Sequence, residues 1–208
     1  NETTPSFVNC FTGIRAQDID VTSSNNAMLG VNTGYSFRGG VARNVSVTDN
    51  IIKATRKGIG FTHWRPLSFL EVADNDIEVD GHTTEGTGIF AELLRGNSTT
   101  ASRFADNDIS LNDARFGIRL QDCQQLGIRE NMIQLKDDAQ QHYDGILVQG
   151  GTFTRMACNG IAGSSTSKDH SGIVVSQPDL AILFCNGLDN PRRGIHLIGE
   201  NSPLFTKG

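Results

Sequence analysis

Short runs in which apolar residues alternate with other residues recur along the whole chain. One run in each repeat unit opens with a Gly followed by an apolar residue. The eight opening pairs are Gly13-Ile14, Gly34-Tyr35, Gly58-Ile59, Gly88-Ile89, Gly117-Ile118, Gly145-Ile146, Gly172-Ile173 and Gly194-Ile195. By subtraction of these numbers, the spacings are 21, 24, 30, 29, 28, 27 and 22 residues. Alternation at period two is typical of strands with one buried face, and a drifting repeat of this length predicts a solenoid.

A second marker, an Asn, recurs between the Gly-led pairs, as Asn50, Asn75, Asn107, Asn131, Asn159 and Asn186. We expect a sharp turn there, between the second and third strands of each unit. Asn tolerates left-handed backbone angles, and its amide can bond to backbone groups and to other Asn side chains. The Gly is expected at the bend into the first strand, where the absence of Cβ suits a tight path.

Three strands in each unit predict an all-β fold, a right-handed, single-stranded parallel β-helix of about eight coils. Three inner columns of apolar side chains are expected, one after each Gly, one two residues further on, and one after each Asn. The first holds Ile14, Tyr35, Ile59, Ile89, Ile118, Ile146, Ile173 and Ile195. The second holds Ala16, Phe37, Phe61, Ala91, Leu120, Val148, Val175 and Leu197. The third holds Ile51, Ile77, Ile109, Ile133 and Ile161.

Length and charge narrow the possible partners. The chain of 208 residues is expected to form one domain, residues 1–208, with a net charge of −5. Its Lys and Arg residues are scattered, which argues against nucleic acid as a partner. No apolar stretch approaches the roughly 18 residues of a membrane span, so no membrane partner is expected. The end, LFTKG, is typical of an unfinished coil, so we interpret the chain as a fragment whose termini meet further coils or a neighbouring copy.

The two markers of the repeat together resemble those of a known group of β-helix proteins. The G-I-x-(L/V) opening and the x-(D/C)-N-x-I turn are similar to the β-helix repeats of pectin-lyase-like proteins, from about Phe11 to Gly199. The late segments CNGIAG and CNGLDNPRRGIHLIGENSPLF are most similar to repeats of large secreted bacterial surface proteins. The resemblance implies a secreted or cell-surface location. It implies no single function, because the group contains lyases, hydrolases, epimerases, tailspikes and adhesins.

The outward side chains of the first strands are the main candidates for a ligand site. They alternate with the buried columns and include Arg38, Glu92, Arg119 and Gln121. A polar groove with Arg and Gln suits a polysaccharide or a cell-surface glycan. The alternative is an ordinary solvated sheet face.

The segment His63-Trp64-Arg65 is a second candidate, because it contains the only Trp of the chain. An exposed Trp can stack on a sugar ring while His63 and Arg65 bind hydroxyl or carboxylate groups. The alternative is that Trp64 packs on Pro66 and Leu67.

Catalytic motifs of the resembled group are absent or incomplete. Gly81-His82 lacks the second Gly of a G-H-G motif, Asp137-Asp138 lies in an expected loop, and Glu92 is the only carboxylate on the first-strand face. We therefore assign no catalytic residue and no cofactor. The alternative is a polysaccharide lyase or uronan epimerase that uses the loops holding His82 and His142, with Tyr143 and Asp144 beside them.

Acidic residues and cysteines precede the turn Asn residues. The acidic ones are Asp49, Asp74, Asp106 and Glu130. Turn chemistry explains them better than a Ca²⁺ site, so no metal is assigned. Cys158 and Cys185 occupy the same position one coil apart, as a disulfide or as a column of buried, reduced thiols.

These observations predict a non-catalytic extracellular β-helix module for structural display, adhesion or carbohydrate binding. The alternatives are the lyase or epimerase and a pure filament or scaffold segment without a ligand.

Overall fold

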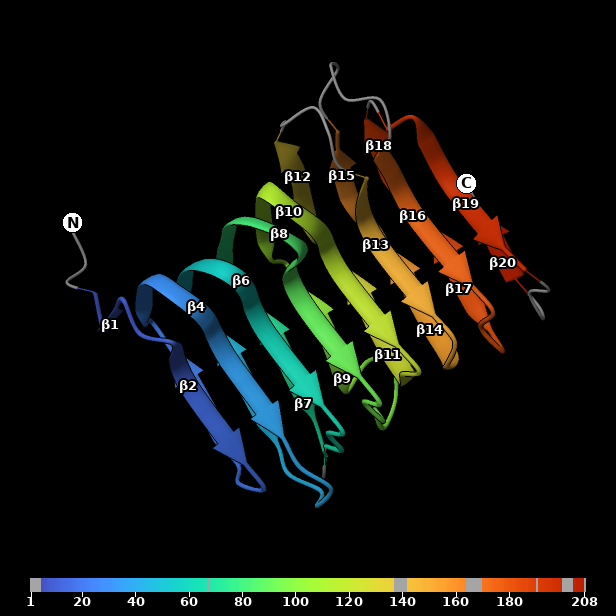
Figure 1. Cartoon of the computed structure of the whole chain (residues 1–208). Coiled ribbons are helices and arrows are strands. Elements are labelled where there is room, and N and C mark those ends of the chain that lie inside the picture. Colours follow the sequence, from blue (N-terminus) through green and yellow to red (C-terminus); the bar gives the residue numbers. More distant parts are fainter. Residues whose placement is uncertain are drawn as a thin grey trace.

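The computed structural model describes residues 5–66, 68–136, 142–163, 170–189, 191–199 and 204–207. All regular elements within these ranges are β-strands, and every strand pair is parallel. The strands form a 12-stranded sheet and an 8-stranded sheet that follow the same axis (Figure 1). The predicted parallel β-solenoid is therefore confirmed.

The first sheet contains the first and third strands of the repeat units. Its strands are β1 (Phe7–Val8), β2 (Thr12–Gln17), β4 (Ala27–Arg38), β6 (Ile51–Thr62), β8 (Asp76–Glu92), β10 (Asp108–Gln121), β12 (Met132–Lys136), β13 (Tyr143–Gln149), β15 (Gly160–Ala162), β16 (His170–Ser176), β18 (Gly187–Asp189) and β19 (Arg193–Ile198). The second sheet contains β3 (Val21–Ser24), β5 (Val45–Thr48), β7 (Leu70–Ala73), β9 (Ser102–Ala105), β11 (Gln124–Arg129), β14 (Thr152–Ala157), β17 (Ala181–Phe184) and β20 (Leu204–Lys207).

The path of the chain differs from the expected unit in one respect. In β4, β6, β8 and β10 the third strand of one unit continues into the first strand of the next, with register shifts at the bend. The solenoid makes about six turns, fewer than the eight coils expected. The last Gly-led unit, β19 and β20, has no third described strand.

Strand register confirms the first two inner columns. Ile14, Tyr35, Ile59, Ile89, Ile118, Ile146, Ile173 and Ile195 are consecutive partners across the first sheet, as are Ala16, Phe37, Phe61, Ala91, Leu120, Val148, Val175 and Leu197. Aromatic rings stack within the core, where the centroids of Phe37 and Phe61 lie 4.7 Å apart. Burial of these columns removes apolar surface from water and holds the two sheets together.

The third inner column required a correction at its N-terminal end. Ile52, and not Ile51, is in register with Ile77, Ile109, Ile133 and Ile161. Ile52 is fully buried, whereas Ile51 is 37 % exposed and lies beside Asp76. The inner position is therefore the second residue after the Asn, in agreement with the alternation of a strand.

The Asn residues form a buried ladder, as predicted, but the left-handed backbone lies one residue earlier. Asn75 Nδ2 donates to Asn107 Oδ1 at 2.9 Å, and Asn107 Nδ2 donates to Asn131 Oδ1 at 2.9 Å. At each of these turns the residue before the Asn has a positive φ, for example Asp106 at 55° and Glu130 at 57°. In each turn the first residue thus adopts the left-handed angle, and the following Asn makes the hydrogen bonds.

From Gly13 to Gly172, the repeated Gly is required by space and not by an unusual backbone angle. A Cβ on Gly117 would lie 2.5 Å from the carbonyl oxygen of Gly145 and 2.6 Å from the Cγ2 of Ile133. Gly117 is not among the glycines with positive φ. Close approach of successive coils at this corner excludes any side chain.

Candidate functional site

The outer face of the first sheet carries three columns of side chains. The Gln121 column contains Gln17, Arg38, Thr62, Glu92, Gln121, Gln149, Ser176 and Ile198. The Arg119 column contains Arg15, Ser36, Gly60, Phe90, Arg119, Leu147, Val174 and His196. The predicted residues Arg38, Glu92, Arg119 and Gln121 therefore do share one face, with Glu92 directly beside Gln121.

The third column was missed in the sequence. The Phe116 column contains Thr12, Thr33, Lys57, Thr87, Phe116, Asp144, Ser171 and Arg193, each of which directly precedes a repeated Gly. Strict alternation along the strand predicts an inward side chain at the position before the Gly. These residues were therefore not expected on the outer face. The bend at the Gly breaks the alternation. The regular spacing of these residues was the available signal.

A hollow of about 200 Å³ lies on this face over β6, β8 and β10. Its lining residues are Arg56, Lys57, Glu85, Thr87, Phe90, Arg119 and Gln121. Lys57 Nζ lies 3.9 Å from the centroid of the Phe90 ring. The guanidinium carbon of Arg119 lies 5.8 Å from the Phe90 centroid and 5.0 Å from that of Phe116. We call Lys57, Phe90, Arg119 and Phe116 the cation–aromatic row.

Positive charge exceeds negative charge in this hollow. Arg56 Nη2 pairs with Glu85 Oε2 at 2.7 Å, which leaves the charges of Lys57 and Arg119 without a carboxylate among the lining residues. Burial and the neighbouring Arg56 lower the pKa of Lys57. The aromatic rings partly replace the water that these cations lose. An anion placed here would relieve the repulsion between the cations.

The predicted site at His63-Trp64-Arg65 is separate and has different properties. Trp64 is fully buried, packs edge-on against Phe37 at 5.7 Å, and donates from Nε1 to the Arg43 carbonyl at 3.3 Å. The ring is thus not available to stack on a sugar, so the expectation of an exposed Trp64 is wrong. The alternative, in which Trp64 packs against the protein itself, is correct, and the ring contacts Phe37. Leu67, which was an expected neighbour, lies outside the described residues.

His63 and Arg65 are exposed beside the buried Trp64. They line a hollow of about 220 Å³ together with Gly40, Trp64, Leu93 and Arg95. It shares no lining residue with the hollow at Arg119. Of the sequence-predicted residues, Arg119 and Gln121 line one hollow, His63, Trp64 and Arg65 line the other, and Arg38 and Glu92 line neither. The two sets are neighbours on the solenoid, because the His63 backbone N–H donates to the Glu92 carbonyl at 2.9 Å.

Ionisable side chains meet where β13 and β16 begin. His142 Nε2 lies 2.8 Å from Asp144 Oδ1, and the rings of Tyr143 and His170 are 4.8 Å apart. Asp144 is 4 % exposed and follows Phe116 in the Phe116 column. Burial raises the pKa of Asp144, and the His142 charge opposes this shift. Of the other residues in the alternative catalytic set, the His82 side chain, Asp137 and Asp138 lie outside the described residues.

The carboxylates of the acidic turn residues on neighbouring coils repel one another. Burial and the charges of Asp106 and Asp49 raise the pKa of Asp74. Among the residues that the structure describes, no group of three or more His, Cys, Asp or Glu side chains is placed to hold a metal ion.

Cys158 and Cys185 are free thiols, and both are exposed. The expectation that these thiols are buried is therefore wrong. Like Asp106 and Glu130, Cys158 and Cys185 occupy the left-handed turn position before the Asn. Side chains at this position are exposed, whereas the Asn that follows points inward.

Comparison with known proteins returned no relative. No family model matches the chain, and no curated protein or solved structure is significantly similar to it. Within the described part of the chain, no helix has the length and apolar character needed to span a membrane. The assignment of the chain to the parallel β-solenoids therefore rests on its own strand pairing and its ladder of buried Asn side chains.

Proposed function

We propose that this chain is a non-catalytic extracellular module for adhesion or display that binds acidic polysaccharides on the outer face of its first sheet. The observation that supports the proposal is the cation–aromatic row over β6, β8 and β10. Aromatic faces stack on the apolar faces of sugar rings, and Arg and Lys pair with carboxylates. Arg119 Nε is buried and has no hydrogen-bond partner among the described residues, so a ligand acceptor would satisfy it.

The repeat geometry favours a polymer over a single sugar. Neighbouring strands of a sheet lie about 4.7–4.9 Å apart. A polysaccharide that lies along the solenoid axis therefore contacts a new strand at each of these intervals. Lys57, Phe90 and Arg119 lie on three successive strands of this kind. Cations and stacking rings that alternate along the axis suit a ligand that repeats a ring and a carboxylate.

Affinity electrophoresis in gels that contain polygalacturonate, with dextran as the neutral polymer, tests the proposal. We expect retardation by polygalacturonate alone and at least tenfold weaker binding for Arg119→Ala and for Phe90→Ala. Arg65→Ala is the matched control, because Arg65 is an exposed Arg in the separate hollow beside Trp64. Equal retardation of wild type and Arg119→Ala contradicts the proposal. No retardation at all leaves the scaffold as the better account.

The His142–Asp144 pair favours one second candidate, a polysaccharide lyase or uronan epimerase. A buried carboxyl group with a raised pKa next to a histidine is a common acid–base arrangement. Asp144 lies on the same outer face as the cation–aromatic row. Release of unsaturated products, measured by ultraviolet absorbance and lost in His142→Ala, would establish a lyase, and a change in the uronate epimer composition of the polymer, lost in the same variant, would establish an epimerase. Binding without any product supports the adhesion module.

A further inference from the structure

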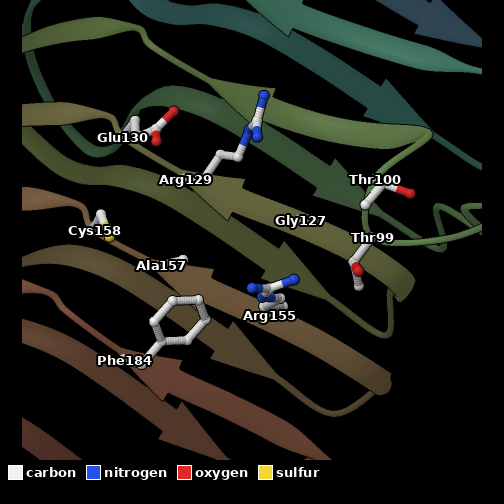
Figure 2. A pocket seen from close by; sticks show the side chains of 9 residues that line it. All are labelled: Thr99, Thr100, Gly127, Arg129, Glu130, Arg155, Ala157, Cys158 and Phe184. Carbon is white, nitrogen blue, oxygen red and sulfur yellow. The ribbon is translucent and has the colours of Figure 1, made fainter. Parts of the chain in front are cut away.

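A third hollow lies on the outer face of the second sheet, away from the face proposed to bind polysaccharide. It has a volume of about 200 Å³ and is formed by β11, β14, β17 and the segment that precedes β9. Figure 2 shows its lining side chains, which are those of Thr99, Thr100, Arg129, Glu130, Arg155, Ala157, Cys158 and Phe184, around the backbone of Gly127.

One wall of the hollow depends on the absence of a side chain at Gly127. Arg103, Gly127 and Arg155 are register partners on β9, β11 and β14, and so share one outward column. A Cβ on Gly127 would overlap the carbonyl oxygen of Thr99. The segment at Thr99 therefore closes over Gly127 and forms one wall, while Arg155 forms the other (Figure 2). Any larger residue at position 127 would displace the Thr99 segment and so change this wall.

Two arginines line the hollow without an ionic partner. No ion pair among the described residues includes Arg129 or Arg155, whereas the neighbouring Arg103 pairs with Glu71. Arg129 Nε is buried and has no hydrogen-bond partner among the described residues. The guanidinium of Arg155 lies 4.7 Å from the centroid of the Phe184 ring. The buried Nε is a donor that a ligand oxygen would satisfy, since buried polar groups are nearly always bonded.

The charges select the kind of anion. Arg129 and Arg155 contribute two positive charges, and Glu130 is the single carboxylate in the lining. One net positive charge suits a singly charged carboxylate better than a phosphate with two charges. The planar guanidinium of an arginine matches both oxygens of a carboxylate. Phe184 offers a flat apolar face for a ring, and Thr99 and Thr100 offer hydroxyl groups.

We propose that this hollow binds the carboxylate of a ligand the size of one sugar ring, such as a uronate. The site is independent of the polysaccharide face, because it lies on the other sheet and shares no residue with it. Arg129 binds the carboxylate, and Arg155 and Phe184 hold the ring.

Isothermal titration with D-glucuronate, acetate and D-glucose tests this assignment. We expect saturable binding of glucuronate, weaker binding of acetate and no binding of glucose. Arg129→Ala should weaken glucuronate binding at least tenfold, and Arg129→Lys should weaken it less, because Lys keeps the charge but not the two-pronged donor. Arg103→Ala is the matched control on the same sheet face and should bind as wild type does. Circular dichroism checks that each variant is folded.

Three results would overturn the assignment. Glucuronate binding that is unchanged in folded Arg129→Ala excludes the hollow. Equal affinities for acetate and glucuronate exclude a ring-sized ligand. Glucuronate binding that depends on Arg119 and not on Arg129 places the ligand on the first sheet. Because polygalacturonate retardation is measured separately with Arg119→Ala, failure of this site is distinguishable from failure of the proposed function.

Discussion

Asn107 illustrates how a single side chain connects three turns of the solenoid. It is 1 % exposed, and the two hydrogens of its Nδ2 are shared among the carbonyl oxygens of Val72 and Ala105 and Asn131 Oδ1. Its Oδ1 accepts from both nitrogens of Asn75. Because each amide both donates and accepts, no member of the ladder depends on water.

Replacement of this residue, Asn107→Ala, should lower the free energy of unfolding by about 3–5 kcal/mol. The substitution leaves buried groups on both neighbouring turns without partners, and each such group costs about 1–3 kcal/mol. Urea unfolding followed by circular dichroism measures the change. Asn112→Ala is the matched control, because the Asn112 side chain makes an exposed hydrogen bond to Asp80, and we expect a change within about 0.5 kcal/mol. Similar losses for both variants would show that the ladder adds no special stability.

At the scale of the strand, β6 carries a lysine whose charge is sensitive to pH. Burial lowers the pKa of Lys57 below its ordinary value of 10.5. Retardation by polygalacturonate should therefore weaken as the pH rises toward 10.5, because Lys57 loses its proton earlier than an ordinary lysine. Lys57→Arg keeps its charge throughout this range, so its retardation should stay constant. Affinity electrophoresis over a series of alkaline buffers measures both proteins.

The Lys57 contribution to stability has the opposite slope to the expected loss of binding. With the pKa of Lys57 lower in the folded protein, the unfolded chain binds more protons, so the Lys57 contribution to stability increases as the pH rises through this window. Alkaline unfolding caused by other groups, such as the Cys123 thiol, whose pKa burial raises to about 12, would affect wild type and Lys57→Arg alike. A loss of binding that is equal in wild type and Lys57→Arg would contradict a role for Lys57 in the hollow.

The strands also show which features a single sequence can predict. The inner columns were predictable because Gly-Ile and Asn recur wherever the chain faces the core. Lys57 and Phe116 were missed because the bend at the Gly changes the side to which the preceding residue points. Trp64 follows His63, whose φ is 55°, and this left-handed residue directs the indole inward. Backbone angles of this kind leave no trace in the alternation of apolar and polar residues.

At the scale of the whole molecule, stability should differ between the middle and the C-terminal end of the described solenoid. Leu120 and Leu197 belong to the same inner column, yet Leu120 is fully buried and Leu197 is 44 % exposed. Ile195 and Ile198 on the same strand are 46 % and 43 % exposed. In a solenoid each turn is stabilised by its neighbours, so a turn covered on one side alone contributes less.

Leu120→Ala should therefore lower the free energy of unfolding by about 2–5 kcal/mol, as expected for a cavity in a packed core. Leu197→Ala, the same substitution at the end of the same column, should cost less than about 1 kcal/mol, because the leucine already contacts water. Urea unfolding compares the two variants. An equal cost would show that the end of the column is covered in solution by a second copy or by additional coils. Repeating the unfolding over a range of protein concentrations separates these, because a second copy alone makes the loss depend on concentration.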